Sequence, residues 1–187
     1  MNLDGFALPV KKLKGTDPVE MLDLSGKKLG VASAVVIASL ISVNGALTVT
    51  NLLHNQLDAE SAKMLAEVAK QKGISLCGIR RNQTTADFRN KYLEPADAIL
   101  LASDLSQAVV TGGLTSLDLS SNQLSLGLDL HGRGTYTAEG ITAIADALRV
   151  NGALTMCDLR NNDVGEEGKA LIRNAAEGKA GFLKLHL

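Results

Sequence analysis

The sequence predicts an α/β fold in the form of a right-handed solenoid arc, with parallel strands on its concave face and helices on its convex face. One observation behind this prediction is a short pattern of apolar residues that recurs along the chain. A second is the helical spacing of apolar residues that follows each copy of the pattern. The third is an ordinary globular composition, with 45% apolar and 21% charged residues in a chain of 187 residues.

The strand pattern is clearest in residues 114–124, with leucine at the first, fourth, sixth and eleventh places and asparagine at the ninth. Related segments begin near residues 19, 47, 74, 154 and 182. In the segment that begins at residue 74, Asn82 occupies the ninth place. Two of the intervals between starts are longer than the rest, which predicts inserts near residues 85–97 and 125–136.

The second half of each unit predicts an amphipathic helix. Apolar residues recur every four positions, as in Ile37 and Ile41 or Ile144 and Leu148. The uncharged stretch 29–47 imitates a membrane span, but it is rich in Ala, Ser and Gly and is interrupted by Asn-Gly. We therefore interpret it as the helix of the first unit and expect no membrane partner.

The spacing of leucines and asparagine, followed by a helix, resembles the leucine-rich repeat proteins of the ribonuclease-inhibitor-like class. The resemblance covers residues 19–187 and implies a repeat domain with a horseshoe shape. It also implies a scaffold for protein contacts, since this class includes inhibitors, GTPase regulators, innate sensors and adaptors. Lys27 departs from the asparagine of the pattern, as in a terminal repeat.

Residues 1–18 are predicted to be an N-terminal capping segment. Val35, Val36 and Leu40 give the first helix an apolar outer face, which needs cover. Leu3, Phe6, Leu8, Val10 and Leu13 of the capping segment could supply that cover, and a dimer interface is the alternative. The last strand, from 182, has no helix after it. We therefore expect either that the chain is a fragment of a longer protein, or that this uncapped edge meets a partner or a copy of itself.

Charge and cysteine content limit the partners and the cellular location that we expect. Nineteen basic and 20 acidic residues give a net charge of −1, which gives no reason to expect a nucleic-acid partner. Cys77 and Cys157 both take the inward fourth place, with another unit between them, so they are predicted to be buried thiols in a reducing, cytoplasmic location. The sequon at Asn82 is discounted, because that asparagine is expected to be structural. No metal-ligand spacing appears, and no cofactor is predicted.

The concave face is the first candidate binding surface. Met21, Val49 and Leu76 would form an exposed apolar row. Asp118 and Asp158 would be close, like the carboxylates of a hydrolase, but aspartate also recurs there with the strand rhythm. We therefore favour partner binding over catalysis. The candidate residues on this face are Met21, Asp23, Val49, Asn51, His54, Leu76, Arg80, Arg81, Asp118, Asp158 and Arg160.

The two inserts are the second candidate surface, because both follow a strand and should lie side by side on one edge. Phe88 and Tyr92 are spaced to share one face of a helical turn. The rings either bind a partner or only pin each insert to the domain. The candidate residues are Phe88, Arg89, Tyr92, His131, Arg133 and Tyr136.

The sequence thus predicts a non-enzymatic protein–protein interaction module that uses the concave face and the insert edge. The alternative is a regulator of a small GTPase, in which Arg80, Arg81 or Arg160 would contact phosphates or order a switch loop. A hydrolase that uses Asp118 and Asp158 is the third and least supported hypothesis.

Overall fold

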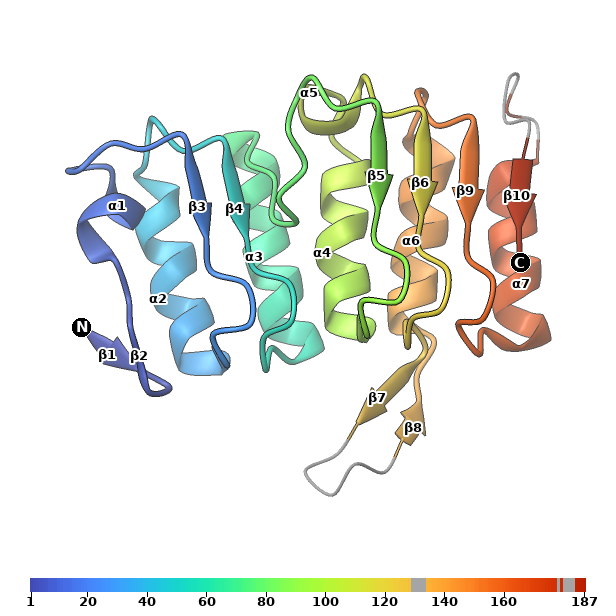
Figure 1. Cartoon of the computed structure of the whole chain (residues 1–187), viewed down its shortest axis with the longest axis horizontal. Coiled ribbons are helices and arrows are strands. Elements are labelled where there is room, and N and C mark those ends of the chain that lie inside the picture. Colours follow the sequence, from blue (N-terminus) through green and yellow to red (C-terminus); the bar gives the residue numbers. More distant parts are fainter. Residues whose placement is uncertain (129–133, 178, 180–183) are drawn as a thin grey trace.

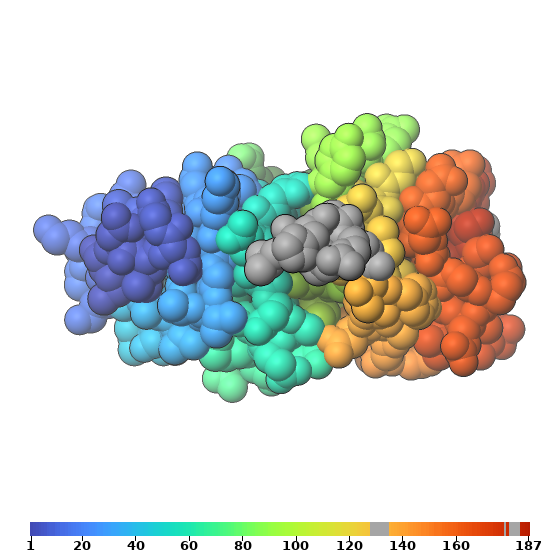
Figure 2. Space-filling model, turned by 90° about the horizontal axis from the view of Figure 1, so that it is seen from below, coloured from blue at the N-terminus to red at the C-terminus, as the bar shows by residue number. Residues whose placement is uncertain are grey.

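The protein, seen in a computed structural model, is described for residues 1–128, 134–177, 179 and 184–187. Short strands form one layer and helices form a second layer behind it (Figure 1). The chain runs through both layers in sequence order from the blue end to the red end, as Figure 2 also shows from below.

The described strands form four separate sheets. β3 (Met21–Asp23) and β4 (Val49–Asn51) make a parallel pair. A parallel four-stranded sheet has the order β10-β9-β6-β5. Its strands are β5 (Thr85–Asp87), β6 (Ser116–Asp118), β9 (Met156–Asp158) and β10 (Lys184–His186). Two antiparallel pairs, β1 (Asn2–Leu3) with β2 (Phe6–Ala7) and β7 (Leu126–Leu128) with β8 (Gly134–Tyr136), complete the set.

The longer helices pack side by side in chain order, α2 on α3, α3 on α4, α4 on α6 and α6 on α7. The apolar side chains between the helix and strand layers form the core, and the sixth-place residues Leu24, Leu52, Ile79, Leu119 and Leu159 are all buried, as predicted. No helix in the described residues is long and apolar enough to cross a membrane. The helices are α1 (Val10–Lys14), α2 (Val31–Ser42), α3 (Ala59–Lys72), α4 (Pro95–Leu105), α5 (Ala108–Thr111), α6 (Glu139–Val150) and α7 (Gly165–Ala176).

The predicted solenoid with one continuous strand layer is wrong, because the parallel pairing breaks between β4 and β5. Residues 74–84, here called the seam, contain only isolated bridges from Ser75 and Cys77 to β4. Buried Asp104 of α4 explains part of the break, since its carboxylate accepts the backbone N–H groups of Leu76 (2.7 Å) and Cys77 (3.1 Å). Gly78 then turns the chain with φ of 78°, a conformation that favours glycine.

The strand expected in the seam lies instead in the first predicted insert. β5 begins at Thr85, and Phe88 and Leu93 then take the places that Leu24 and Leu29 hold after β3. Residues 85–97 therefore supply a strand, a turn and the start of a helix, so the prediction of an insert there is wrong. The range of the second predicted insert contains the antiparallel β7–β8 pair, which projects from the end of the strand layer (Figure 1). The predicted common edge of two inserts is thus absent from the described residues.

Structural asparagines connect neighbouring segments. Asn122 accepts the N–H groups of Lys91 and Leu93 at 3.0 Å each, and its amide donates to the carbonyl oxygen of Phe88 at 2.8 Å. Asn55 makes the same set of bonds one sheet away, to Lys27, Leu29 and Leu24. Asn162 donates to Leu119 and Leu159. Asn82, predicted to belong to this group, is exposed, so that assignment is wrong.

The N-terminal segment packs on α2. Leu8 and Leu13 are buried, and the Asp4 carboxylate accepts the N–H of Gly30 and the hydroxyl of Ser33 at the start of the helix. The outer face of α2 nevertheless stays uncovered at Val35, which is 51% exposed, so the predicted cover of that face is only partial.

Candidate functional site

The strand-bearing face carries a line of aspartates, here called the carboxylate row: Asp87, Asp118 and Asp158. Parallel register places them side by side at the ends of β5, β6 and β9, with His186 of β10 next in line. The predicted closeness of Asp118 and Asp158 is therefore confirmed.

Each aspartate of the carboxylate row has a structural task. Its Oδ1 accepts the backbone N–H two residues later, at 2.9 Å for Arg89, 2.9 Å for Ser120 and 3.1 Å for Arg160. Asp23 closes the same turn after β3 at 3.0 Å. Aspartate side chains commonly stabilise turns in this way, which explains why the residue recurs at the fifth place.

Two arginines neutralise the carboxylate row. Arg89 lies 2.9 Å from Asp87 and 3.8 Å from Asp118, and Arg160 lies 2.5 Å from Asp158. Hydrogen bonds from Arg160 lower the pKa of Asp158, and those from Arg89 lower the pKa of Asp87. A carboxylate pair in a hydrolase needs one member that holds a proton near neutral pH. The lowered pKa of Asp158 does not fit a carboxylic acid that holds a proton near neutral pH.

A hollow of about 350 Å³ opens beside the seam, where β3 and β4 begin. We call it the arginine hollow, and its lining residues are Glu20, Met21, Thr48, Val49, Arg80, Arg81 and Asn82. Met21 is 45% exposed, but Val49 and Leu76 are only 4% and 0% exposed. The predicted apolar row of three residues is therefore wrong. Leu76 faces the core because Asp104 binds the seam backbone from the helix side.

The aromatic candidates are dispersed. Phe88 is half-buried against the core, while Tyr92 is 69% exposed. The two do not share a helical turn, because Asn90 and Tyr92 adopt positive φ of 54° and 53°. Tyr136 is 51% exposed, and its hydroxyl donates to the carbonyl oxygen of Val164. His131 and Arg133 lie outside the described residues.

The remaining candidates lie near the strand ends. Asp23 is exposed, and its pKa is lowered chiefly by the hydroxyl of Ser25. Asn51 accepts the N–H of Leu53. His54 is exposed with φ of 60°, and its backbone N–H is held by the carboxylate of Asp97.

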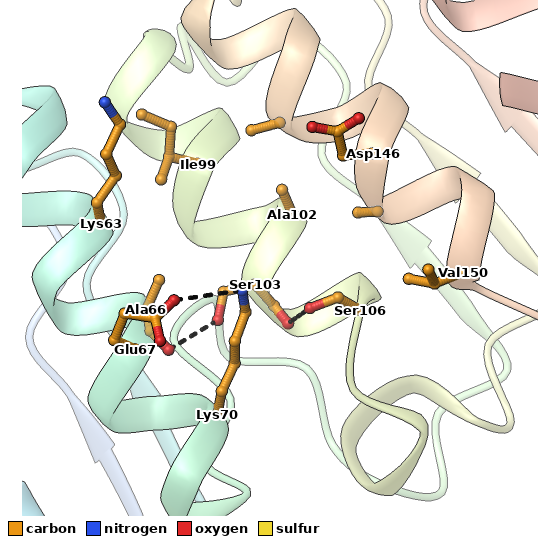
Figure 3. Close-up of a pocket in the computed structure, with 12 residues that line it drawn as sticks. Lys63, Ala66, Glu67, Lys70, Ile99, Ala102, Ser103, Ser106, Asp146 and Val150 are labelled. Atoms are coloured by element: carbon orange, nitrogen blue, oxygen red, sulfur yellow. Dashed lines mark hydrogen bonds and ion pairs between the residues drawn. The ribbon is translucent and has the colours of Figure 1, made fainter. Parts of the chain in front are cut away.

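Sequence reasoning missed a groove on the helix side (Figure 3), which has a volume of about 370 Å³. Its floor is α4, where Ile99 and the short side chains of Ala102 and Ser103 lie between α3 and α6. Lys70 of α3 forms an ion pair with Glu67 at 3.7 Å on the rim, and Ser103 donates to the carbonyl of Ala66 on α3. The sequence signal for this groove was the set of small residues, three alanines and one serine, within residues 95–105.

The buried titratable groups belong to the framework. Burial raises the pKa of Asp104 to about 7 and that of Cys157 to about 12. Both cysteines are free and buried, as predicted. Across residues 1–128, 134–177, 179 and 184–187, no group of three or more His, Cys, Asp or Glu is placed to hold a metal ion.

No family model matches the chain, and no curated protein matches it. Among solved structures, it is similar to the tropomodulin C-terminal domain of Caenorhabditis elegans, with a TM-score of 0.46 and 14% identity over 90% of this chain and 89% of that one. It is also similar to actin-binding site 2 of leiomodin-1, with a TM-score of 0.48 and 15% identity over 89% of this chain and 84% of that one. Because no family model of the ribonuclease-inhibitor-like class matches the chain, the predicted resemblance to that class is corrected.

Proposed function

We propose that the chain is a non-enzymatic module that binds a protein partner through its strand-bearing face. The observation that carries this proposal is the carboxylate row with its paired arginines. The backbone of each strand end fixes one aspartate, while the side chains of Arg89 and Arg160 remain 59% and 56% exposed. Alternating charges in fixed positions suit recognition of a complementary surface.

Other exposed candidate residues support the same role. Met21, Tyr92 and Tyr136 are large apolar side chains that stay exposed, and side chains of this kind often anchor protein partners. The two free, buried thiols support the cytoplasmic location expected from the sequence. The leiomodin-1 similarity adds nothing to this proposal, because it is too distant to carry a partner over.

Regulation of a small GTPase has weaker support. Such a role needs an arginine that can reach a phosphate. Arg160 is engaged with Asp158, and Arg81 donates to the carbonyl of Gly73, so of the three candidate arginines only exposed Arg80 has a guanidinium with no such contact among the described residues. We therefore keep protein recognition as the proposed function.

Charge reversal of the row tests the proposal. The immobilised protein is used to capture partners from an extract of its own source, which are identified by mass spectrometry. We expect the double variant Arg89→Glu, Arg160→Glu to lose a specific partner. The matched control, Arg149→Glu with Arg173→Glu, changes two exposed arginines on the helix side and should retain it. Equal capture by both variants would contradict a binding role of this face.

A further inference from the structure

The arginine hollow differs from the carboxylate row in its charge balance. Two guanidinium groups line it, from Arg80 and Arg81, against one carboxylate, from Glu20. Arg89 and Arg160 are paired with aspartates, whereas neither Arg80 nor Arg81 has an ion-pair partner among the residues that the structure describes. An exposed, unneutralised pair of arginines favours an anionic ligand.

Backbone contacts fix where these arginines stand. Arg81 donates from its guanidinium to the carbonyl oxygen of Gly73 at 3.2 Å, at the C-terminal end of α3, where a cation is favoured. The N–H of Arg80 is held by the side chain of Gln83 at 3.2 Å. Arg80 therefore extends from an anchored turn, and its exposed guanidinium is available to a ligand.

The hollow also offers an apolar contact. Met21 is 45% exposed on its wall, and buried Val49 lines it as well. A methionine side chain adapts easily to the shape of an aliphatic partner. The hydroxyl of Thr48 is already bonded to the backbone of Glu20. The volume of about 350 Å³ lies at the lower end of the range for ligand pockets, roughly 300–1,000 Å³.

We propose that the arginine hollow receives an acidic segment of a partner protein, with a carboxylate against Arg80 and an aliphatic side chain against Met21. This inference rests on the proposed function, because it specifies the chemistry of the partner. Charge complementarity selects an acidic segment, and the exposed thioether selects an aliphatic neighbour. Nucleic acid is disfavoured, since it needs a larger basic surface than this chain of net charge −1 provides.

The test uses a fluorescein-labelled octapeptide of alternating glutamate and leucine, with binding followed by fluorescence anisotropy. We expect the full chain to bind it, and Arg80→Glu to weaken binding at least about tenfold, because like charges then face each other. Met21→Ser should weaken binding severalfold through lost apolar contact. Arg173→Glu, on the exposed face of α7, is the matched control and should bind like the unmodified protein.

Four results would overturn the inference: no binding of the peptide, no effect of Arg80→Glu, equal binding of the same peptide with glutamine in place of glutamate, or displacement by an oligonucleotide of equal charge. The last result would show recognition of phosphate instead. Arg80 is exposed, so its variant should fold normally, which circular dichroism checks. Partner capture with Arg80→Glu separates the two proposals. A partner that is lost with the Arg89 and Arg160 variant but retained with Arg80→Glu would support the row and oppose the hollow.

Discussion

An asparagine that binds two neighbouring segments constrains the strand layer at the scale of a single residue. Asn122 is 5% exposed. Its side chain bonds the backbone of the segment that follows β5 and the backbone of the segment that follows β6. An apolar residue there would leave several buried backbone groups without partners.

We therefore expect Asn122→Ala to lower the free energy of unfolding by about 2–4 kcal/mol, since each unpaired buried group costs about 1–3 kcal/mol. Urea denaturation followed by circular dichroism measures this loss. Asn82→Ala is the matched control, because Asn82 is exposed, and it should stay within about 0.5 kcal/mol of the unmodified protein. A larger effect at Asn82 than at Asn122 would restore the sequence-based assignment.

Asp104 is a second residue whose burial has a measurable consequence. Its carboxylate is fully buried and accepts bonds from the seam, and burial raises its pKa from 3.8 to about 7. The folded state then binds a proton more tightly than the unfolded state. This contribution to the free energy of unfolding is therefore fully present below pH 3.8 and is lost as the pH rises to about 7. Above about pH 7, Asp104 adds no further pH dependence to stability.

We expect Asp104→Asn to flatten the dependence of stability on pH between pH 5 and 7 relative to the unmodified protein. Urea midpoints of the two proteins at pH 5, 6, 7 and 8 give the comparison. The variant should also be less stable, because an amide cannot accept all the bonds that the carboxylate accepts from Ser75, Leu76 and Cys77. Parallel pH profiles would exclude titration of Asp104 in this range.

At the scale of elements, the longer helices and every described parallel strand except β5 could be predicted from the sequence, because the period of the apolar residues indicates the type of element. β5 could not be, since Gln83, Ala86 and Lys91 stand where the pattern has leucine, leucine and asparagine. The seam, in contrast, satisfied the pattern with Ile74, Cys77 and Ile79, all buried, yet forms no strand. Part of this difference comes from Asp104, which binds the seam backbone but lies far along the chain from it.

The close contact of α6 with α4 gives a prediction at this scale. A Cβ on Gly140 would lie 2.6 Å from the carbonyl oxygen of Leu124 and 2.9 Å from the Cβ of Ala98. We expect Gly140→Ala to destabilise the protein by about 1–3 kcal/mol, although alanine favours helices by about 1 kcal/mol. Thermal unfolding measures the effect. Gly152→Ala is the control and should leave stability nearly unchanged, because a Cβ there meets open space. If Gly140→Ala stabilised the protein, the close approach of α6 to α4 would not be required for stability.

At the scale of the whole molecule, the candidate site was only partly accessible to sequence reasoning. The closeness of Asp118 and Asp158 was predicted because register follows from periodicity. Asp87, the third member of the carboxylate row, was not predicted, since its strand β5 departs from the pattern. The arginine hollow and the buried position of Val49 depend on the path of the seam, which local pattern does not determine. Residues 1–18 remain, in our proposal, the cap of the α2 end, supported by the bonds of Asp4 and by buried Leu8 and Leu13.

The break in the strand layer also predicts where the molecule opens first. Cys77 lies in the seam, which has only isolated bridges, whereas Cys157 lies in β9 with a parallel neighbour on each side. Regions with fewer ladder hydrogen bonds open locally at lower free energy than the global transition. We therefore expect N-ethylmaleimide to modify Cys77 faster than Cys157 under native conditions, with rates in urea giving the intrinsic reactivity of each thiol. Mass spectrometry of peptides separates the two sites. Equal native rates, after that correction, would mean that the two sheets open together and that the seam is as strongly held as the strands around it.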